Sequence, residues 1–112
     1  MPKHQNDRLQ GTIDLLVLKV LAGTGGALHG YAIAQRIHAL SEDGLRIEEG
    51  SLYPALHRMT NEKWLRAEWG VTETHRNARF YPLTPAGRRQ LGEEERRWLE
   101  LTAAVGKVLE FA

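Results

Sequence analysis

Hydrophobic and polar side chains separate onto two faces of a short segment in the middle of the chain. The apolar residues of this segment recur at the spacing of one helical face: Leu52, Ala55, Leu56 and Met59. Polar and aromatic residues fall on the opposite face: Tyr53, Pro54, His57, Arg58 and Asn61. The pattern predicts a helix over residues 50–59 that rests on a hydrophobic core and turns its other side to water or to a polar partner.

The start of this helix has two interpretations. If Ser51 is the N-cap, Pro54 falls in the first turn, where its missing N–H group costs little. If the helix begins nearer Glu48, Pro54 lies inside it and strains it slightly.

Two helices are predicted before this segment. Residues 12–22 are apolar on nearly every side, with only Asp14 and Lys19 as exceptions. A helix of this composition must be covered all round, so we expect one face in the core of the chain and another against a second subunit. The second helix is expected over residues 31–40, and residues 30–62 together form a predicted helix-turn-helix.

Four shorter segments connect or precede these helices. Residues 1–10 are polar and are expected to be an N-terminal arm. Residues 23–26 contain three glycines and predict a left-handed cap at the end of the first helix. Residues 41–44 are expected to form a turn, and residues 45–47 a very short strand.

An alternating pattern after the central helix predicts a β-hairpin. The apolar positions of its first strand are two residues apart, as in a half-buried strand: Leu65, Ala67, Trp69 and Val71. Residues 80–83 predict the returning strand, in which Pro82 is tolerated at an edge or at a strand end. Residues 72–78 are polar and predict the hairpin tip. We name the whole hairpin, residues 64–83, the wing.

The last part of the chain predicts a long helix over residues 85–110. Thr84 offers a capping hydroxyl, and Pro85 suits the first helical position. A seam with the four-three spacing of packed helices is formed by Leu91, Glu95, Trp98, Thr102, Val105 and Leu109, and it is widened by Leu101, Val108 and Phe111. No other part of the chain is left to cover this seam, so we expect a homodimer. The predicted dimer interface combines the first and last helices: Ile13, Leu16, Val20, Leu91, Trp98, Thr102, Val105 and Leu109.

Length and composition limit the function classes. With 112 residues, the chain is expected to be one small domain, residues 1–112. The absence of cysteine excludes disulfides, thiolate metal sites and thiol nucleophiles, and it fits a cytoplasmic protein. No apolar run approaches the roughly 20 residues of a membrane span, so we expect no membrane partner.

Catalytic residues, metal sites and cofactors are not expected. The five histidines are scattered without the spacing of metal ligands. Residues 93–95 form an exposed acidic run, whereas paired-carboxylate catalysis needs a buried cleft. Residues 23–26 lack the lysine and the preceding strand of a phosphate-binding loop. We therefore predict that the protein is not an enzyme.

Positive charge is concentrated on the central helix and the wing. The whole chain has a net charge of +1, but residues 57–89 hold seven Lys or Arg against three Asp or Glu, a net charge of +4. Residues 1–56 sum to −1 and residues 90–112 to −2. A basic cluster attracts polyanions even when the total charge is small. For a basic segment taken alone, a solvated charged surface is the alternative interpretation.

A polar helix followed by a basic hairpin is the arrangement of a winged-helix DNA-binding domain. An α-helix fits the major groove of B-DNA, and side chains near its N-terminus reach base edges. Arginine on a hairpin tip can enter a narrow minor groove or hold a phosphate. The candidate DNA-binding residues are Ser51, Tyr53, Pro54, His57, Arg58, Arg76 and Arg79. For Tyr53, the alternative is a half-buried aromatic ring with its hydroxyl in solvent.

Three separated motifs resemble the PadR family of winged-helix transcriptional regulators. They are LHGY at residues 28–31, GSLYPALHRM at 50–59 and ARFYPLTPAG at 78–87. The resemblance covers nearly the whole chain and places it with short members that lack a separate C-terminal domain. It implies a mainly α fold with a small β-hairpin: a winged helix-turn-helix plus a long C-terminal dimerisation helix. Family wings are often rich in glycine, and this wing is not.

The resemblance also implies a function. It indicates a homodimer that places a helix in the major groove and the wing in the minor groove of double-stranded DNA. Such a protein represses neighbouring genes, often until a small molecule binds, and we expect its operator to be an inverted repeat. Trp98 is the candidate for lining a pocket for a planar or aromatic effector, with a simple packing role as the alternative. A winged helix that binds proteins instead of DNA is the alternative function.

Overall fold

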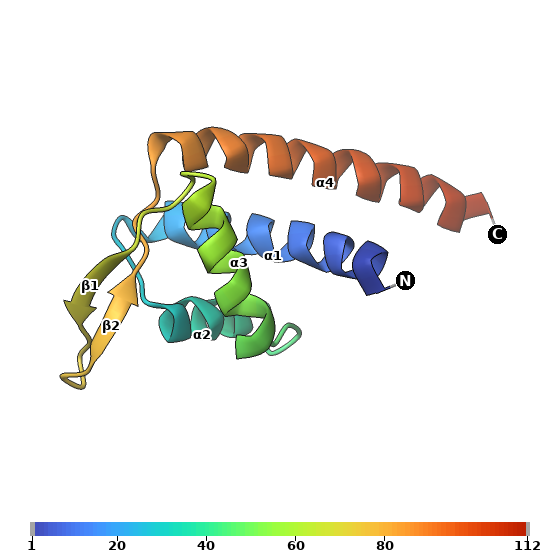
Figure 1. Cartoon of the computed structure of the whole chain (residues 1–112). Helices are drawn as coiled ribbons and strands as arrows, with labels where there is room; N and C mark the ends of the chain where they lie inside the picture. The colour runs from blue at the N-terminus through green and yellow to red at the C-terminus, as the bar shows by residue number, and fades with distance from the viewer. Residues whose placement is uncertain (1, 112) are drawn as a thin grey trace.

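The chain folds into a helical body from which a β-hairpin projects (Figure 1). The computed structural model describes the backbone of residues 2–111 and the side chains of residues 11–111. Within this range the elements are α1 (Pro2–Thr24), α2 (Gly30–Leu40), α3 (Glu49–Asn61), β1 (Glu68–Val71), β2 (Asn77–Phe80) and α4 (Pro85–Phe111). The fold is mainly α with a β-hairpin wing and a long C-terminal helix, which confirms the fold class predicted from the sequence.

Helix α1 is longer than the hydrophobic pattern predicts. Residues 2–10 continue the helix, so the prediction of a polar arm is wrong for them, while Met1 lies outside the described residues. Pro2 is acceptable at the first helical position, and the next residue that opposes a helix is Gly11. At the other end, α1 stops at Thr24 and is followed by Gly25, whose φ of +72° is the left-handed geometry of a helix terminus.

The connection between α2 and α3 contains no strand within the described chain. Residues 45–47 are irregular, so the short strand predicted there is wrong. The backbone is left-handed at Glu42 and Asp43, with φ of +52° and +67°, and the Leu45 N–H group donates to the Ser41 hydroxyl (2.9 Å). The two described strands pair with each other and not with residues 45–47. No described strand is therefore left to form backbone hydrogen bonds with this segment.

Helix α3 starts earlier than a Ser51 cap would place it. Glu48 is the N-cap and makes no side-chain capping hydrogen bond, which agrees with the second interpretation of the sequence. Pro54 therefore lies inside the helix, and its nitrogen cannot donate to the Gly50 carbonyl one turn earlier. The missing hydrogen bond is confined to the first two turns of α3.

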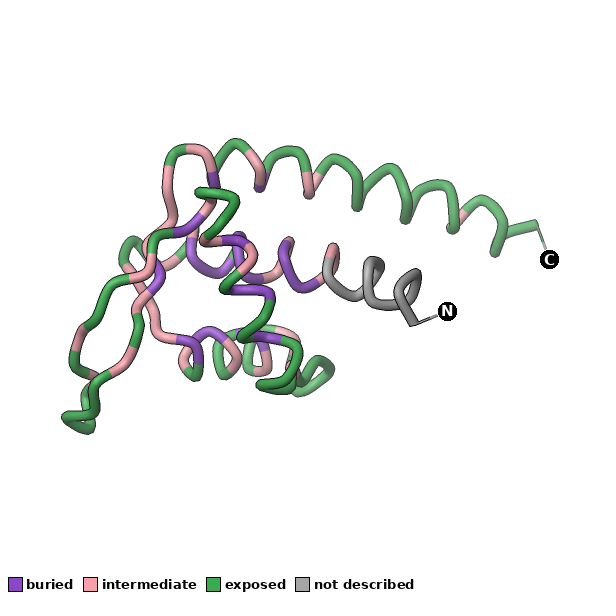
Figure 2. The backbone as a smooth tube through the Cα atoms, viewed as in Figure 1, coloured by how far each residue is buried: buried purple, intermediate pink, exposed green. Residues whose placement is uncertain are grey.

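The hydrophobic core lies where α1, α2 and α3 meet (Figure 2). Helix α1 contacts each of the other three described helices. The largest fully buried side chains come from these helices and from the base of the wing: Val17, Leu18, Ile33, Leu52, Leu56, Met59 and Leu65. The apolar face of α3 is therefore covered by the protein's own core, as the sequence predicts.

One ion pair joins α1 to α3 at the edge of this core. Asp14 is only 4% exposed, and its two carboxylate oxygens accept hydrogen bonds from the Arg58 guanidinium at 2.9 and 2.7 Å. Burial raises the pKa of the Asp14 carboxyl above its usual range, and the hydrogen bonds from Arg58 offset part of that effect. The same hydrogen bonds raise the pKa of the more exposed Arg58 guanidinium, so the two partners differ in which effect dominates. Because the attraction within a buried ion pair repays the cost of taking its charges out of water only in part, we infer that the pair fixes the position of α3 on α1 more than it adds stability.

Backbone hydrogen bonds attach the base of the wing to the start of α2. The Tyr81 N–H group donates to the Leu28 carbonyl (3.0 Å), and His29 forms an isolated antiparallel bridge with Phe80. The rings of His29 and Phe80 also meet edge to face, with centroids 5.4 Å apart. The wing is thus fixed relative to the helix-turn-helix at its base.

Helix α4 begins in the cap predicted from the sequence. The Thr84 hydroxyl accepts a hydrogen bond from the Gly87 N–H group (3.0 Å) and donates to the Lys63 carbonyl (2.6 Å). A Cβ atom at Gly87 would overlap the Trp64 carbonyl oxygen, so glycine lets the first turn of α4 lie against the chain that enters the wing.

The outer half of α4 extends beyond the helical body and contributes to dimensions of 54 × 31 × 29 Å (Figure 2). Its large apolar side chains are exposed: Trp98, Leu99, Leu101, Val105, Val108, Leu109 and Phe111. Three residues predicted at the dimer interface are instead buried in the core of one chain: Ile13, Val20 and Leu91. A partner is therefore not needed to cover them. None of the helices described, α4 included, is long and apolar enough to cross a membrane.

We predict that Arg58→Ala destabilises the fold by roughly 3 kcal/mol, because it leaves Asp14 buried without a partner. The double variant Asp14→Leu with Arg58→Met removes both charges and should recover most of that loss. Urea unfolding of both variants and the wild-type chain measures the difference. Equal destabilisation in the single and double variants would show that the charges are not the cause.

Candidate nucleic-acid interface

The outer face of α3 is not covered by the protein's own chain. Ser51, Pro54 and His57 are exposed, and Tyr53 is 42% exposed. On the inner face, no side chain is more than 2% exposed: Leu52, Ala55, Leu56 and Met59. The wing therefore leaves the polar face of α3 accessible.

Tyr53 is positioned by the first residue of α2. A Cβ atom at Gly30 would lie 2.6 Å from Cε1 and 2.9 Å from the hydroxyl oxygen of Tyr53, so the ring rests directly on the glycine. This contact joins the first motif, residues 28–31, to the second motif, residues 50–59. The ring is half-buried on the helical body, while a large part of the side chain stays accessible.

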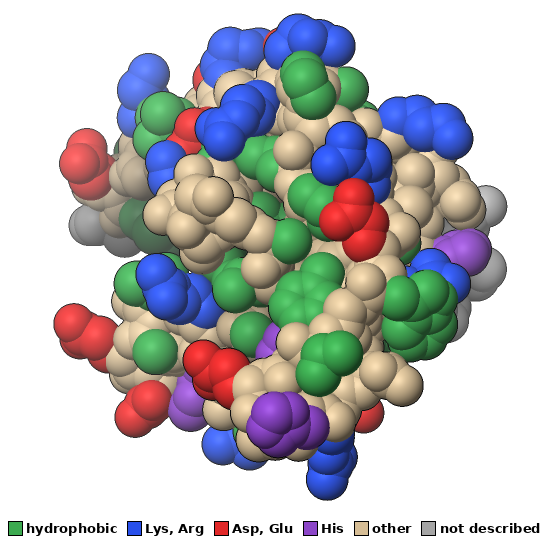
Figure 3. Space-filling view, turned by 90° about the vertical axis from the view of Figure 1, so that its left-hand side faces the viewer, with side chains coloured by type: hydrophobic (Ala, Val, Ile, Leu, Met, Phe, Trp, Pro, Cys, Tyr) green, Lys and Arg blue, Asp and Glu red, His purple; other side chains and the backbone are tan. Residues whose placement is uncertain are grey.

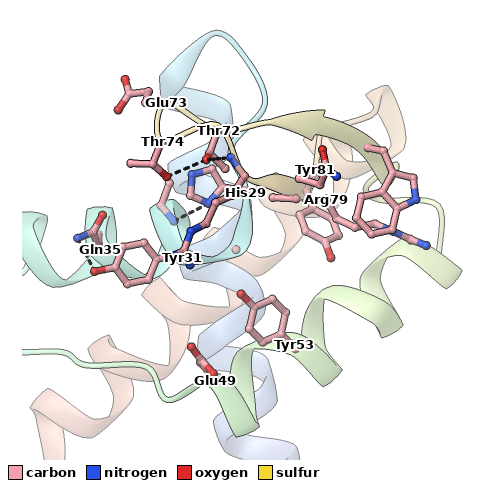
Figure 4. A pocket seen from close by; sticks show the side chains of 16 residues that line it. His29, Tyr31, Gln35, Glu49, Tyr53, Thr72, Glu73, Thr74, Arg79 and Tyr81 are labelled. Atoms are coloured by element: carbon pink, nitrogen blue, oxygen red, sulfur yellow. Dashed lines mark hydrogen bonds between the residues drawn. The ribbon is translucent and has the colours of Figure 1, made fainter.

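An open hollow of about 930 Å³ lies between α2, the first turns of α3 and the wing (Figure 4). Helix α2 contributes Tyr31 and Gln35, whose side chains hydrogen-bond to each other at 3.1 Å. Helix α3 contributes Glu49 and Tyr53, and the wing contributes Arg79 among others. Aromatic, amide and charged groups from three elements thus border one surface.

The outer part of the wing is more exposed than its sequence predicts. Leu65 at the base is 1% exposed, but Trp69 and Val71 are 70% and 61% exposed. The prediction of a half-buried strand is therefore wrong for Trp69 and Val71, because the hairpin has left the helical body at that point (Figure 1). Alternating apolar residues indicate a strand, but they do not show whether another part of the protein covers its apolar face.

Trp69 and Arg79 lie opposite each other on the two strands of the wing. The Arg79 guanidinium carbon is 5.0 Å from the centre of the Trp69 ring, a cation–π contact. Both side chains border the hollow beside α3. The indole thus supports an arginine at the surface where a polyanion would approach.

The tip of the wing is shaped by its own hydrogen bonds. The Thr72 N–H group donates to the Arg76 carbonyl (2.8 Å), and the Arg76 N–H group donates to the Thr72 hydroxyl (3.1 Å). His75 has a φ of +63°, a left-handed conformation that is uncommon outside glycine and enriched in histidine. A tight turn that exposes Arg76 therefore forms here without glycine.

Arg58 does not extend from the exposed face of α3. Its guanidinium is bound to Asp14, so we remove it from the candidate DNA contacts. The helical spacing places residue 58 at the border between the two faces, and a long side chain there can turn either way. The buried carboxylate on α1 decides the direction.

Basic side chains on the wing side of the molecule are spread out, with acidic side chains between them (Figure 3). Arg66 lies near Glu68, with 3.4 Å between its Nε atom and a carboxylate oxygen. Arg76 and Arg79 border the hollow. Among the residues that line the hollow, the lysine or arginine side chains are therefore these two arginines.

Sequence reasoning missed several groups that border this surface. Trp69 was assigned to a core-facing strand position, although Arg79 lies opposite it in the register. Tyr31 and Gln35 are four residues apart on the polar side of α2, a helical spacing that could have indicated their hydrogen bond. Glu49 lies at the N-terminus of the helix only in the second interpretation of the sequence, in which the helix begins nearer Glu48, and an acidic residue there does not by itself indicate a binding site.

A second hollow, of about 360 Å³, lies between α1 and α4. Its lining is mostly apolar and includes Leu16, Trp98 and Leu99. Trp98 is 44% exposed, and an ion pair between Lys19 and Glu95 (2.9 Å) joins the two helices beside it. In the described part of the chain, no group of three or more His, Asp or Glu side chains is arranged to hold a metal ion.

Comparisons with known proteins find one family. Residues 17–93 match the PadR-like family of transcriptional regulators. A transcriptional regulator of Mycobacterium tuberculosis is 40% identical over 78 residues, which are 70% of this chain and 69% of that protein. The solved structure of a PadR family transcriptional regulator from Eggerthella lenta is 32% identical, with a TM-score of 0.73 over 98% of this chain and 93% of its own. A transcriptional regulator from Clostridium thermocellum is 25% identical, with a TM-score of 0.79 over 90% and 96%.

We predict that Gly30→Ala displaces the Tyr53 ring, because the new methyl group would occupy the position of the ring edge. The fold should persist, since the ring is the outer part of a flexible side chain. Ring resonances of the three tyrosines, assigned with a Tyr53→Phe sample, report the displacement by NMR. Gly92→Ala is the control, because nothing lies within 4 Å of a Cβ atom there. Unchanged Tyr53 resonances in Gly30→Ala would refute the contact.

Proposed function

Since this chain belongs to the PadR-like family of transcriptional regulators, we propose that it is a repressor that binds an inverted-repeat DNA operator as a homodimer. The observation that carries the proposal is the uncovered polar face of α3 beside the wing. A regulator of this kind acts by occupying DNA rather than by catalysing a reaction.

Helix α3 enters the major groove in this proposal. Ser51 and His57 approach base edges or phosphates from exposed positions, and the Tyr53 hydroxyl donates to a phosphate oxygen. Pro54 offers an apolar contact to a thymine methyl group. The two α3 helices of a dimer would lie about one DNA turn apart, roughly 34 Å, and the two-fold axis then requires an inverted repeat.

The wing contacts the neighbouring minor groove or its phosphates. Arg76 extends from the tip, and Arg79 lies nearer the body of the wing. The stacking of Arg79 on Trp69 restricts the guanidinium before DNA binds, so less side-chain entropy is lost on binding. Neither arginine forms an ion pair within the described residues, so both are free to neutralise phosphate.

The apolar stripe of α4 supports the homodimer. Val105 is 46% exposed and Leu109 is 72% exposed, although both side chains are apolar. With Trp98 and Thr102 they follow one side of the helix, and Leu16 of α1 lies near the same end of the stripe beside Trp98. Contiguous apolar surface of this kind marks an interaction site. We therefore place the partner chain on α4 and on the outer side of α1.

A small planar or aromatic effector is proposed to bind at Trp98. The hollow of about 360 Å³ is within the usual size range of small-molecule sites and is mostly apolar. A ligand there would release the operator only through its higher affinity for the dimer arrangement that does not fit DNA. The alternative is that Trp98 only packs against the partner chain, and in that case it lines no effector site.

Binding to the DNA upstream of the chain's own reading frame tests the proposal. A gel-shift or anisotropy titration should give an affinity that falls steeply with salt, because bound phosphates release counterions. The protein-interaction alternative predicts no binding, or weak binding that salt does not change.

We predict that Arg76→Ala weakens DNA binding and reduces the slope of log K against log[salt] by about one unit per protomer. The reason is the loss of one phosphate contact from each wing. Lys107→Ala is the matched control, since it removes one positive charge from the last turns of α4. The C-terminal end of α4 lies away from the wing (Figure 1). If both variants have the same slope, Arg76 is not a phosphate contact.

We predict that Val105→Glu gives a monomer that binds the operator weakly, because a carboxylate would have to be buried in the seam. Sedimentation velocity measures the oligomeric state. Lys107→Glu places a carboxylate on the polar side of the same helix and should leave the dimer intact. A dimer that survives Val105→Glu with unchanged affinity would contradict the proposed interface.

A further inference from the structure

We propose that Glu49 selects cytosine at one position of each operator half-site, by accepting a hydrogen bond from the cytosine N4 amino group in the major groove. This inference rests on the proposed DNA-binding function and adds a specificity-determining residue to it. It is carried by the position of Glu49, by its lack of a partner and by the chemistry of a carboxylate beside DNA.

Glu49 is placed where a groove-binding helix meets base edges. It is the first residue of α3, it is exposed, and it borders the hollow next to Tyr53 (Figure 4). Glu49, Tyr53 and His57 are four residues apart and therefore follow one side of the helix. The N-terminal residues of a helix in the major groove are those that contact bases.

The Glu49 carboxylate forms no ion pair and accepts no hydrogen bond among the described residues. Glu68 on the wing differs in this respect, because it lies near Arg66 at 3.4 Å. An unpaired carboxylate at a DNA-binding surface is repelled by phosphates. Glu49 therefore weakens DNA binding unless it meets a hydrogen-bond donor on the DNA.

The major groove offers two donors to such a carboxylate, and one fits better. An ionised carboxylate only accepts hydrogen bonds, and the donors there are the N4 amino group of cytosine and the N6 amino group of adenine. Adenine presents N7, an acceptor, next to its amino group on the same base, and that atom repels the second carboxylate oxygen. The other bases present acceptors only and are disfavoured. Cytosine is therefore the base that Glu49 selects.

A favourable charge at the helix N-terminus is the competing explanation for Glu49. The positive end of the helix dipole stabilises an acidic residue there whether or not DNA binds. Glu48 provides a matched comparison, because it is adjacent, exposed, of the same charge, and does not border the hollow. A purely electrostatic role predicts similar effects at both positions.

Selection of bound sequences from a random duplex library tests the inference with the wild-type chain, Glu49→Gln and Glu48→Gln. We expect wild type and Glu48→Gln to select the same inverted repeat with cytosine at one position of each half-site. Glu49→Gln should lose that preference by about five- to a hundredfold in competition binding, because an amide can also donate to guanine, thymine or adenine acceptors. Glu49→Asp keeps the charge and shortens the side chain, so it should also lose the preference while melting at the wild-type temperature.

The outcomes separate this inference from the proposed function. If the wild-type chain selects an inverted repeat and Glu49→Gln selects the same bases, the cytosine contact is refuted and the repressor proposal stands. If both glutamine variants change the preference equally, the effect is electrostatic and the inference is also refuted. If the wild-type chain selects no sequence, the proposed function itself fails.

Discussion

The packing of α3 against the central helix α1 is the contact on which the rest of the structure depends. Its inner side chains are almost completely buried: Leu52, Ala55, Leu56 and Met59. Once that face is in the core, helical geometry places Ser51, Tyr53 and His57 on the outside. The hydrogen-bonded pair of Asp14 and Arg58 then limits how far α3 can rotate or slide on α1. The position of the exposed polar face of α3 is therefore a consequence of the core.

The three sequence motifs meet at this surface although they are far apart along the chain. Gly30 supports the ring of Tyr53, and the backbone of Tyr81 is bound to that of Leu28 immediately before the same helix. The start of α2 thus holds both the polar helix and the wing. Rigid attachment of this kind is what a domain needs if two elements are to enter neighbouring grooves of one duplex.

Much of the fold could be predicted from the sequence, because helical and alternating periods report directly on local structure. Periodicity does not report which way a long side chain turns when its residue lies between the two faces of a helix. It therefore predicts a DNA-facing Arg58, whereas in the structure this side chain turns toward Asp14 on α1. It also does not show where the body of the protein ends, so Trp69 was expected to be half-buried when it is 70% exposed. The polar composition of residues 2–10 predicts an arm, whereas the backbone is helical there, because composition alone does not distinguish a polar helix from an arm.

We propose that duplex DNA occupies the outer face of α3 and the wing. Adding the selected duplex to the ¹⁵N-labelled chain and following the backbone amide signals by NMR tests this most directly. We expect the largest signal changes at Ser51, His57 and Arg76, and little change around Ile33 in the core. Signal changes that avoid α3 and the wing, with tight binding all the same, would contradict it.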